Sequence, residues 1–131
     1  MFRKAFVILA LLLPLLAGTA WAAPYDAKAF ADAQAAGKPI VVHVDASWCI
    51  TCKAQRPIIA AIMASPEYSD LQLFNVDFDS QKDLMQKFGT DQRSTLIVFQ
   101  GDKEVGRSTG DTDAGRIKAL VAKSKPSKGW F

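Results

Sequence analysis

The sequence IVVHVDASWCITCK, residues 40–53, joins a strand-like apolar run to two cysteines that stand three positions apart. Cys49 and Cys52 are the only cysteines of the chain, so any sulfur chemistry must take place here. Residues at i and i+3 lie on one face of a helix, which brings the two thiols close enough to form a small disulfide. The start of a helix also carries unpaired N–H groups and a positive dipole end, which stabilise a thiolate. The pattern predicts a reactive thiol pair.

The first 22 residues have the features of an export signal. Two basic residues precede an apolar run over 6–16, and Ala20-Trp21-Ala22 has the small-x-small pattern of a cleavage site. We expect cleavage after Ala22, because a cut one residue later would leave Pro24 at the new N-terminus. A retained membrane anchor is the alternative, but the run is shorter than the about 20 residues of a spanning helix. Export predicts a protein of the bacterial periplasm, or of the outside of the cell, where disulfides persist, and we favour the periplasm.

Residues 23–131 form one small domain by their length. Removing the signal leaves 14 basic and 13 acidic side chains, so most of the apparent basicity disappears. This balance gives no reason to expect nucleic acid or an anionic membrane as a partner. We expect a monomer.

The apolar periodicity and the turn residues predict an α/β fold. Helices are expected over 25–36, 49–64, 80–88 and from Asp111 or Thr112 to about 123, and strands over 40–45, 71–78, 95–100 and 103–108. Asp26 is the expected N-cap of the first helix, and Pro57 falls inside the second. The first two strands should be parallel, and the last two should form an antiparallel hairpin. The result is a central mixed β-sheet of about four strands with helices on both faces.

The chain resembles the thioredoxin-like family from residue 28 to residue 123. A C-x-x-C motif alone is weak evidence, but here it is accompanied by further matches. They are Ala46-Ser47-Trp48-Cys49, Pro57 five residues after Cys52, Asn75-Val76-Asp77, Thr95-Leu96-Ile97-Val98-Phe99 and Gly110. Gly37-Lys38-Pro39 and Trp-Cys-x-x-Cys-Lys are also similar to the periplasmic C-terminal domain of the transmembrane thiol-disulfide interchange protein. The N-terminal strand usual in thioredoxins is short or absent, because only Ala23 and Pro24 precede Tyr25.

The resemblance implies dithiol–disulfide exchange without a cofactor. Cys49 would be the exposed nucleophile, and Cys52 the buried resolving thiol that breaks the mixed disulfide. The partners would be periplasmic proteins with disulfides or thiols, and a separate membrane protein would supply electrons. We favour a reductant over an oxidant, because the 42 residues between Cys52 and Thr95 leave no room for the helical insertion of strongly oxidising members.

The chain departs from the family pattern at His43, where thioredoxins carry a buried aspartate. The lysine that accompanies that aspartate corresponds to Leu73. Strand alternation places His43 beneath Cys52, with Asp45 on the same side. His43 is therefore a candidate to take and return the proton of Cys52, with Asp45 orienting it. The alternative is a neutral core histidine beside a solvated Asp45.

A second departure is Ser94, where thioredoxins place a cis-proline facing the nucleophile. A cis bond before a non-proline residue costs about 2.5–4 kcal/mol, so we expect a trans Arg93–Ser94 bond. The Ser94 hydroxyl is then a candidate to bind the thiolate or a bound peptide. A tolerated loop substitution is the alternative.

The third departure is Ile50-Thr51 in place of the Gly-Pro found between the cysteines of thioredoxins. These residues influence the geometry of the helix start and hence the thiol pKa. Ile50 is expected to be an exposed contact for partners. By its family position Trp48 should shield Cys49, the alternative being a core tryptophan.

A copper-binding or copper-carrying protein on the same scaffold is the alternative function. Cys49, Cys52 and His43 offer three ligands, fewer than the four of a closed zinc site, whereas two thiolates suffice for Cu(I). A purely structural disulfide is disfavoured, because its loop is too small to restrict the unfolded chain much. Trp130 and Phe131 either fold back onto the sheet edge or bind a partner.

Overall fold

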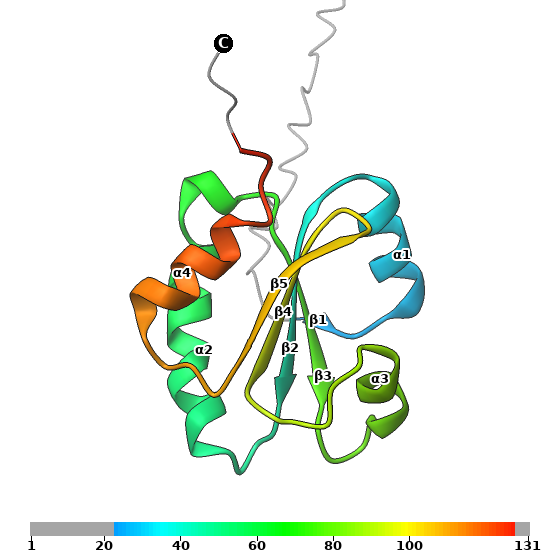
Figure 1. Ribbon diagram of the computed structural model, residues 1–131, viewed down its shortest axis with the longest axis vertical. Helices are drawn as coiled ribbons and strands as arrows, with labels where there is room; N and C mark the ends of the chain where they lie inside the picture. Colours follow the sequence, from blue (N-terminus) through cyan, green and yellow to red (C-terminus); the bar gives the residue numbers. More distant parts are fainter. Residues whose placement is uncertain (1–22, 128–131) are drawn as a thin grey trace, which may run out of the picture.

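Five strands form one mixed sheet in the computed structural model, which describes residues 23–127 (Figure 1). The strands are β1 (Ala23–Pro24), β2 (Pro39–Asp45), β3 (Gln72–Asp77), β4 (Thr95–Gln100) and β5 (Lys103–Thr109), in the order β1-β3-β2-β4-β5. The expected pairings are confirmed: β2 is parallel to β3, and β4 forms an antiparallel hairpin with β5. The fifth strand is the two-residue β1, which pairs with the edge of β3. Residues 1–22, where the export signal is expected, and Trp130 and Phe131 lie outside the described residues.

The helices cover both faces of the sheet, as expected. They are α1 (Ala27–Ala35), α2 (Ile50–Met63), α3 (Lys82–Lys87) and α4 (Ala114–Ala122), with a 3₁₀ turn η1 (Pro66–Tyr68). Figure 1 shows α1 and α3 on one face and α2 and α4 on the other. Within residues 23–127, no helix combines the length and the apolar character that a membrane span requires.

Two apolar clusters, one on each face, hold the layers together. Ile40, Val42 and Val44 of β2 pack toward α1, in a cluster with Phe30, Phe74, Phe99 and their neighbours. Val41 belongs to the opposite cluster, with residues of α2 and α4. Successive residues of a strand point to opposite faces, so His43 shares the α2 face with Val41. Because the apolar residues of β2 are buried on both faces, the side chain of His43 must point toward α2.

The helix starts follow local capping chemistry. Asp26 caps α1 as expected, because its Oδ1 accepts a hydrogen bond from the Ala29 N–H at 2.7 Å. The expected cap of α4 at Asp111 or Thr112 is wrong, since Asp113 accepts from the Arg116 N–H at 2.8 Å. The Asp111 carboxylate instead pairs with the Arg116 guanidinium at 2.9 Å.

Candidate active site

Cys49 occupies the N-cap of α2, a position at which an oxygen-bearing side chain is usual. Its backbone is extended, with φ −85° and ψ 116°, and its Sγ accepts a hydrogen bond from the Cys52 N–H at 3.1 Å. Both thiols are free. The sulfur of Cys49 thus meets the unpaired N–H groups at the positive end of the helix, where a thiolate is stabilised.

Cys49 is more covered than expected. Its exposed fraction is only 3%, and that of Cys52 is 0%, so the expectation of an exposed Cys49 is wrong for this dithiol form. Ala46 and Phe78 pack around the pair, and the Ser94 hydroxyl lies over both sulfurs. The exposed side chains beside Cys49 are Trp48 at 55% and Ile50 at 84%. A partner that reaches Cys49 therefore meets these two apolar surfaces first.

Ser94 contacts both sulfurs from a loop far away in the sequence. Its Oγ lies 3.1 Å from Cys49 Sγ and 3.1 Å from Cys52 Sγ. The hydroxyl carries a single proton, so it donates to one sulfur at a time. No peptide bond of residues 23–127 is cis, so the Arg93–Ser94 bond is trans, while Ser94 has a φ of +58°. This left-handed backbone is held by hydrogen bonds from Ser94 N to Val44 O and from Gly110 N to Ser94 O, both 2.9 Å.

The hydrogen bonds place the negative charge of the pair on Cys49. Burial raises the pKa of Cys49, but hydrogen bonds from the Cys52 thiol, the Ser94 hydroxyl, the Cys52 N–H and Arg93 outweigh burial and lower it to about 7. Burial raises the pKa of Cys52, and the neighbouring Cys49 raises it further. Cys49 is therefore the sulfur that reacts first, while Cys52 stays protonated until it is needed.

His43 lies close to Cys52 and is bound by a residue that the sequence analysis missed. A ring nitrogen of His43 lies within 4.8 Å of Cys52 Sγ and of an Asp45 carboxylate oxygen. His43 Nε2 lies 3.0 Å from Gln55 Oε1, and the ring is only 2% exposed. Burial lowers the pKa of His43 and outweighs the opposing hydrogen bond of Gln55. The ring is thus neutral at neutral pH and able to accept a proton.

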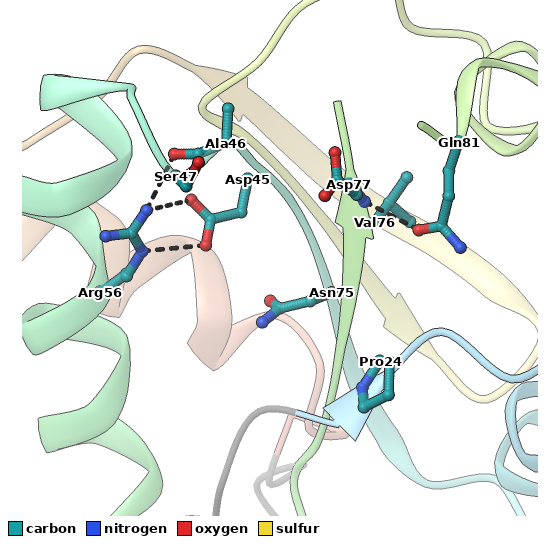
Figure 2. Close-up of a pocket in the computed structure, with 9 residues that line it drawn as sticks. All are labelled: Pro24, Asp45, Ala46, Ser47, Arg56, Asn75, Val76, Asp77 and Gln81. Atoms are coloured by element: carbon teal, nitrogen blue, oxygen red, sulfur yellow. Dashed lines mark hydrogen bonds and ion pairs between the residues drawn. The ribbon is translucent and has the colours of Figure 1, made fainter. Parts of the chain in front are cut away.

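The expected orientation of His43 by Asp45 is wrong, because the hydrogen bonds of the Asp45 carboxylate go to Arg56. The guanidinium of Arg56 donates from Nε and Nη2 to the two carboxylate oxygens at 2.9 and 2.8 Å, and from Nη2 to Ala46 O at 2.9 Å (Figure 2). Burial raises the pKa of Asp45, but these bonds outweigh it and lower the value. The alternation of side chains along the strand correctly placed Asp45 on the same face as His43. Its partner is Arg56 because α2 packs against that face.

A cavity of about 520 Å³ opens beside the Asp45–Arg56 pair (Figure 2). Its lining comes from β1, β2, β3, α2, the loop before Cys49 and the start of α3: Pro24, Asp45, Ala46, Ser47, Arg56, Asn75, Val76, Asp77 and Gln81. The Asp45 carboxylate belongs both to this lining and to the group around Cys52. It therefore stands between the buried thiol and the open cavity.

Trp48 lies on the surface beside the thiols and is not a core residue. Its Nε1–H donates to Asp79 Oδ2 at 2.7 Å, and its ring meets Phe78 edge-on, with ring centres 6.0 Å apart. The Arg93 guanidinium carbon stands 4.9 Å from the centre of the indole ring. Thr51 is half-buried in the first turn of α2. The surface beside Cys49 therefore presents an aromatic ring that carries a carboxylate, Asp79, and a guanidinium, Arg93, at its edges.

The structure adds Gln55, Arg56 and Arg93 to the site. Gln55 carried a signal in the sequence, because it shares the buried face of α2 with Cys52, Ile59 and Ile62 and is the polar member of that set. Arg56 and Arg93 are exposed or half-exposed basic residues, for which the sequence offers no such signal. Leu73 takes the place of the family lysine within the apolar core.

Comparison with known proteins assigns the chain to a family. The family model described as thioredoxin matches residues 22–123. The chain belongs to the thioredoxin family. It is 34% identical over 94 residues to the thioredoxin of Chlamydia muridarum, covering 72% of this chain and 89% of that protein. It is 36% identical over 98 residues to thioredoxin-2 of Saccharomyces cerevisiae, covering 74% and 91%.

A solved structure supports the assignment. The crystal structure of Trxlp from Edwardsiella tarda EIB202 is 41% identical, with a TM-score of 0.72, and covers 75% of this chain and 95% of that one. The chain is thus a thiol-disulfide oxidoreductase whose redox centre is the Cys49-Ile50-Thr51-Cys52 motif and which needs no cofactor. Its substrates are protein disulfides.

Proposed function

We propose that the protein is an exported thioredoxin-like reductant that opens disulfides of periplasmic proteins and is recharged by a separate membrane electron donor. The export features of residues 1–22 and the likeness of Trp-Cys-x-x-Cys-Lys to the periplasmic domain of the transmembrane interchange protein support this location. Between α2 and β4 the chain forms only η1, β3 and α3, which supports a reductant over an oxidant with a helical insertion. The protein acts as a monomer.

The observation that carries the chemistry is the position of Cys49 Sγ at the start of α2, with a pKa lowered to about 7. The Cys49 thiolate attacks a partner disulfide, forming a Cys49–partner bond and releasing one partner sulfur as a thiolate. Cys52 Sγ then attacks Cys49 Sγ, which forms the Cys49–Cys52 disulfide and releases the second partner sulfur. The dithiol is oxidised by two electrons, and the partner disulfide is reduced by two.

His43 handles the proton of the second step. Cys52 enters this step protonated, because burial raises its pKa. A ring nitrogen of the neutral His43 lies within 4.8 Å of Cys52 Sγ and takes the proton as Cys52 attacks. The proton then passes to the leaving partner thiolate or to water. The open cavity beside this group of side chains gives the proton a route to solvent.

Reduction of insulin by dithiothreitol tests the activity. The parent protein should accelerate precipitation of the reduced chains, and Cys49→Ser should abolish the acceleration. Cys52→Ser should instead trap a mixed disulfide through Cys49, visible as a covalent adduct that a reductant removes. Activity retained in Cys49→Ser would contradict the assigned roles.

Equilibration with glutathione tests the direction of electron flow. We expect a reduction potential in the reducing range, near that of thioredoxin at about −270 mV, whereas a value near −120 mV would reverse the assignment to an oxidant. N-terminal sequencing of the protein from a periplasmic fraction tests the export proposal, with Ala23 as the expected first residue.

Copper binding is the second candidate, because His43, Asp45 and Cys52 bring potential ligand atoms within 4.8 Å of one another. Two of these groups already have partners: Gln55 binds His43, and Arg56 binds Asp45. The structure therefore favours exchange chemistry. Copper in the protein as purified, together with no insulin reduction, would reverse this order.

A further inference from the structure

Gln55 is a fully buried amide in the middle of the apolar face of α2. Its exposed fraction is 0%, and burial of an amide is costly unless its polar atoms are hydrogen-bonded. Oε1 lies 3.0 Å from His43 Nε2, while Nε2 donates to Ser94 O at 3.1 Å and to Asp111 O at 2.8 Å. Every polar atom of the side chain is thus used, in bonds to β2, to the loop before β4 and to the loop before α4.

The two carbonyl partners determine how the amide is oriented. A backbone carbonyl only accepts hydrogen bonds, so the amide nitrogen must face Ser94 O and Asp111 O. The amide oxygen is then left to face His43, and an amide oxygen only accepts. His43 Nε2 must therefore carry a proton, and in the neutral ring Nδ1 keeps the lone pair. The carbonyls of Ser94 and Asp111 thus determine the tautomer of His43 through Gln55, although neither is hydrogen-bonded to the ring.

We propose that Gln55 is a positioning residue that holds His43 in the Nε2–H tautomer, so that the Nδ1 lone pair is the atom that accepts the proton of Cys52. The same amide holds the Ser94 carbonyl, whose residue carries the hydroxyl that contacts both sulfurs. Gln55 thereby joins the base to the loop that stabilises the thiolate. This inference rests on the proposed exchange reaction and on the role of His43 in it.

The step that Gln55 serves is the resolution of the mixed disulfide. Cys52 Sγ–H gives its proton to His43 Nδ1, and the sulfur attacks Cys49 Sγ. The Cys49–partner bond breaks, and its electron pair leaves with the partner sulfur. Gln55 is unchanged: it keeps the ring oriented while Nδ1 gains and loses a proton.

The tautomer can be measured directly, because His43 is the only histidine of the chain. Nitrogen-15 NMR of uniformly labelled protein will show one imidazole, with no assignment needed. We expect a protonated Nε2 and an unprotonated Nδ1 in the parent protein. Gln55→Leu should give a mixture of tautomers, because it removes the acceptor for Nε2–H. A protonated Nδ1 in the parent would overturn the proposal without any variant.

The kinetic test uses 5,5′-dithiobis(2-nitrobenzoate) in a stopped-flow instrument. Reaction of Cys49 releases the first nitrothiobenzoate, and attack by Cys52 releases the second, so the two steps are separate phases. Gln55→Leu should slow the second phase by about tenfold, part of the roughly hundredfold that a general base supplies. The first phase should slow much less, because Cys49 attacks as a thiolate and needs no base.

A double variant separates positioning from packing. Gln55→Leu introduced into His43→Ala should slow the second phase no further than His43→Ala alone, because the base it positions is gone. An additional tenfold loss in that background would show a packing defect and overturn the proposal. Absence of any first phase in the parent protein would instead overturn the proposed exchange function, and this inference with it.

Discussion

Ser94 Oγ lies 3.1 Å from Cys49 Sγ, although 45 positions separate the two residues. The approach is possible because Ser94 N binds Val44 O, at the end of the strand that leads to the cysteines. The hydroxyl donates toward a thiolate, and a hydrogen bond to the charged form lowers its pKa. Ser94 therefore takes part in thiolate stabilisation at the position where thioredoxins carry a proline.

Ser94→Ala should raise the pKa of Cys49 from about 7. One lost hydrogen bond of about 1 kcal/mol corresponds to a rise of somewhat less than one pKa unit. The pH dependence of alkylation by iodoacetamide measures this value for the more reactive thiol. Ser47→Ala, on the loop before Cys49, is the matched control and should leave the curve unchanged. An identical curve for Ser94→Ala would show that the hydroxyl does not stabilise the thiolate.

Restoring the proline of the family at this position should destabilise the protein. Proline requires a φ near −65° and has no N–H, whereas Ser94 has a φ of +58° and donates to Val44 O at 2.9 Å. We expect Ser94→Pro to lower the free energy of unfolding by about 3 kcal/mol, measured by urea denaturation. Ser94→Gly is the control, because glycine adopts positive φ without strain and should cost much less. Equal stability of the proline variant and the parent would show that neither the positive φ of residue 94 nor its N–H contributes to stability.

Arg56→Met should leave the half-buried Asp45 carboxylate without its bidentate partner. The side chains of Arg56 and Asp45 are 40% and 20% exposed, so solvent screening limits the expected loss to about 1 kcal/mol. The double variant with Asp45→Asn should recover most of this loss, because no unpaired charge remains. Urea denaturation of the parent, both single variants and the double variant measures the coupling. Additive losses would mean that the pair contributes nothing as a pair.

The buried His43 should make folding weaker in acid. Burial lowers its pKa below the ordinary 6.5, so below pH 6.5 the unfolded chain binds a proton that the folded protein does not. Stability is therefore highest above pH 6.5 and falls as the pH drops toward the lowered folded pKa, below which this loss stops growing. His43→Leu removes the titrating ring while Asp45, Arg56 and Cys52 still face the position. Denaturation over pH 5 to 7 should show a shallower slope for His43→Leu, and parallel slopes would exclude the effect.

The local elements were predictable because their signals lie within a few residues. The strand before Cys49, the Asp26 cap and the hairpin of the last two strands each depend on neighbours along the chain, and each forms as expected. The two-residue β1 could not be predicted from its own residues, since such a short strand is defined only by its pairing with β3. The cap of α4 moved to Asp113 because three nearby side chains were all acceptable caps.

Sequence alone established a single α/β domain with one pair of thiols at a helix start, because periodicity and spacing are properties of the chain itself. Its motifs added the resemblance to thioredoxins. Tertiary structure decided which side chains meet around that pair. Gln55 binds His43, Arg56 binds Asp45, and Ser94 covers both sulfurs only because α2, β2 and the loop before β4 pack together. A polar side chain has several chemically acceptable partners, and only the packing of distant segments determines which one lies within hydrogen-bonding distance.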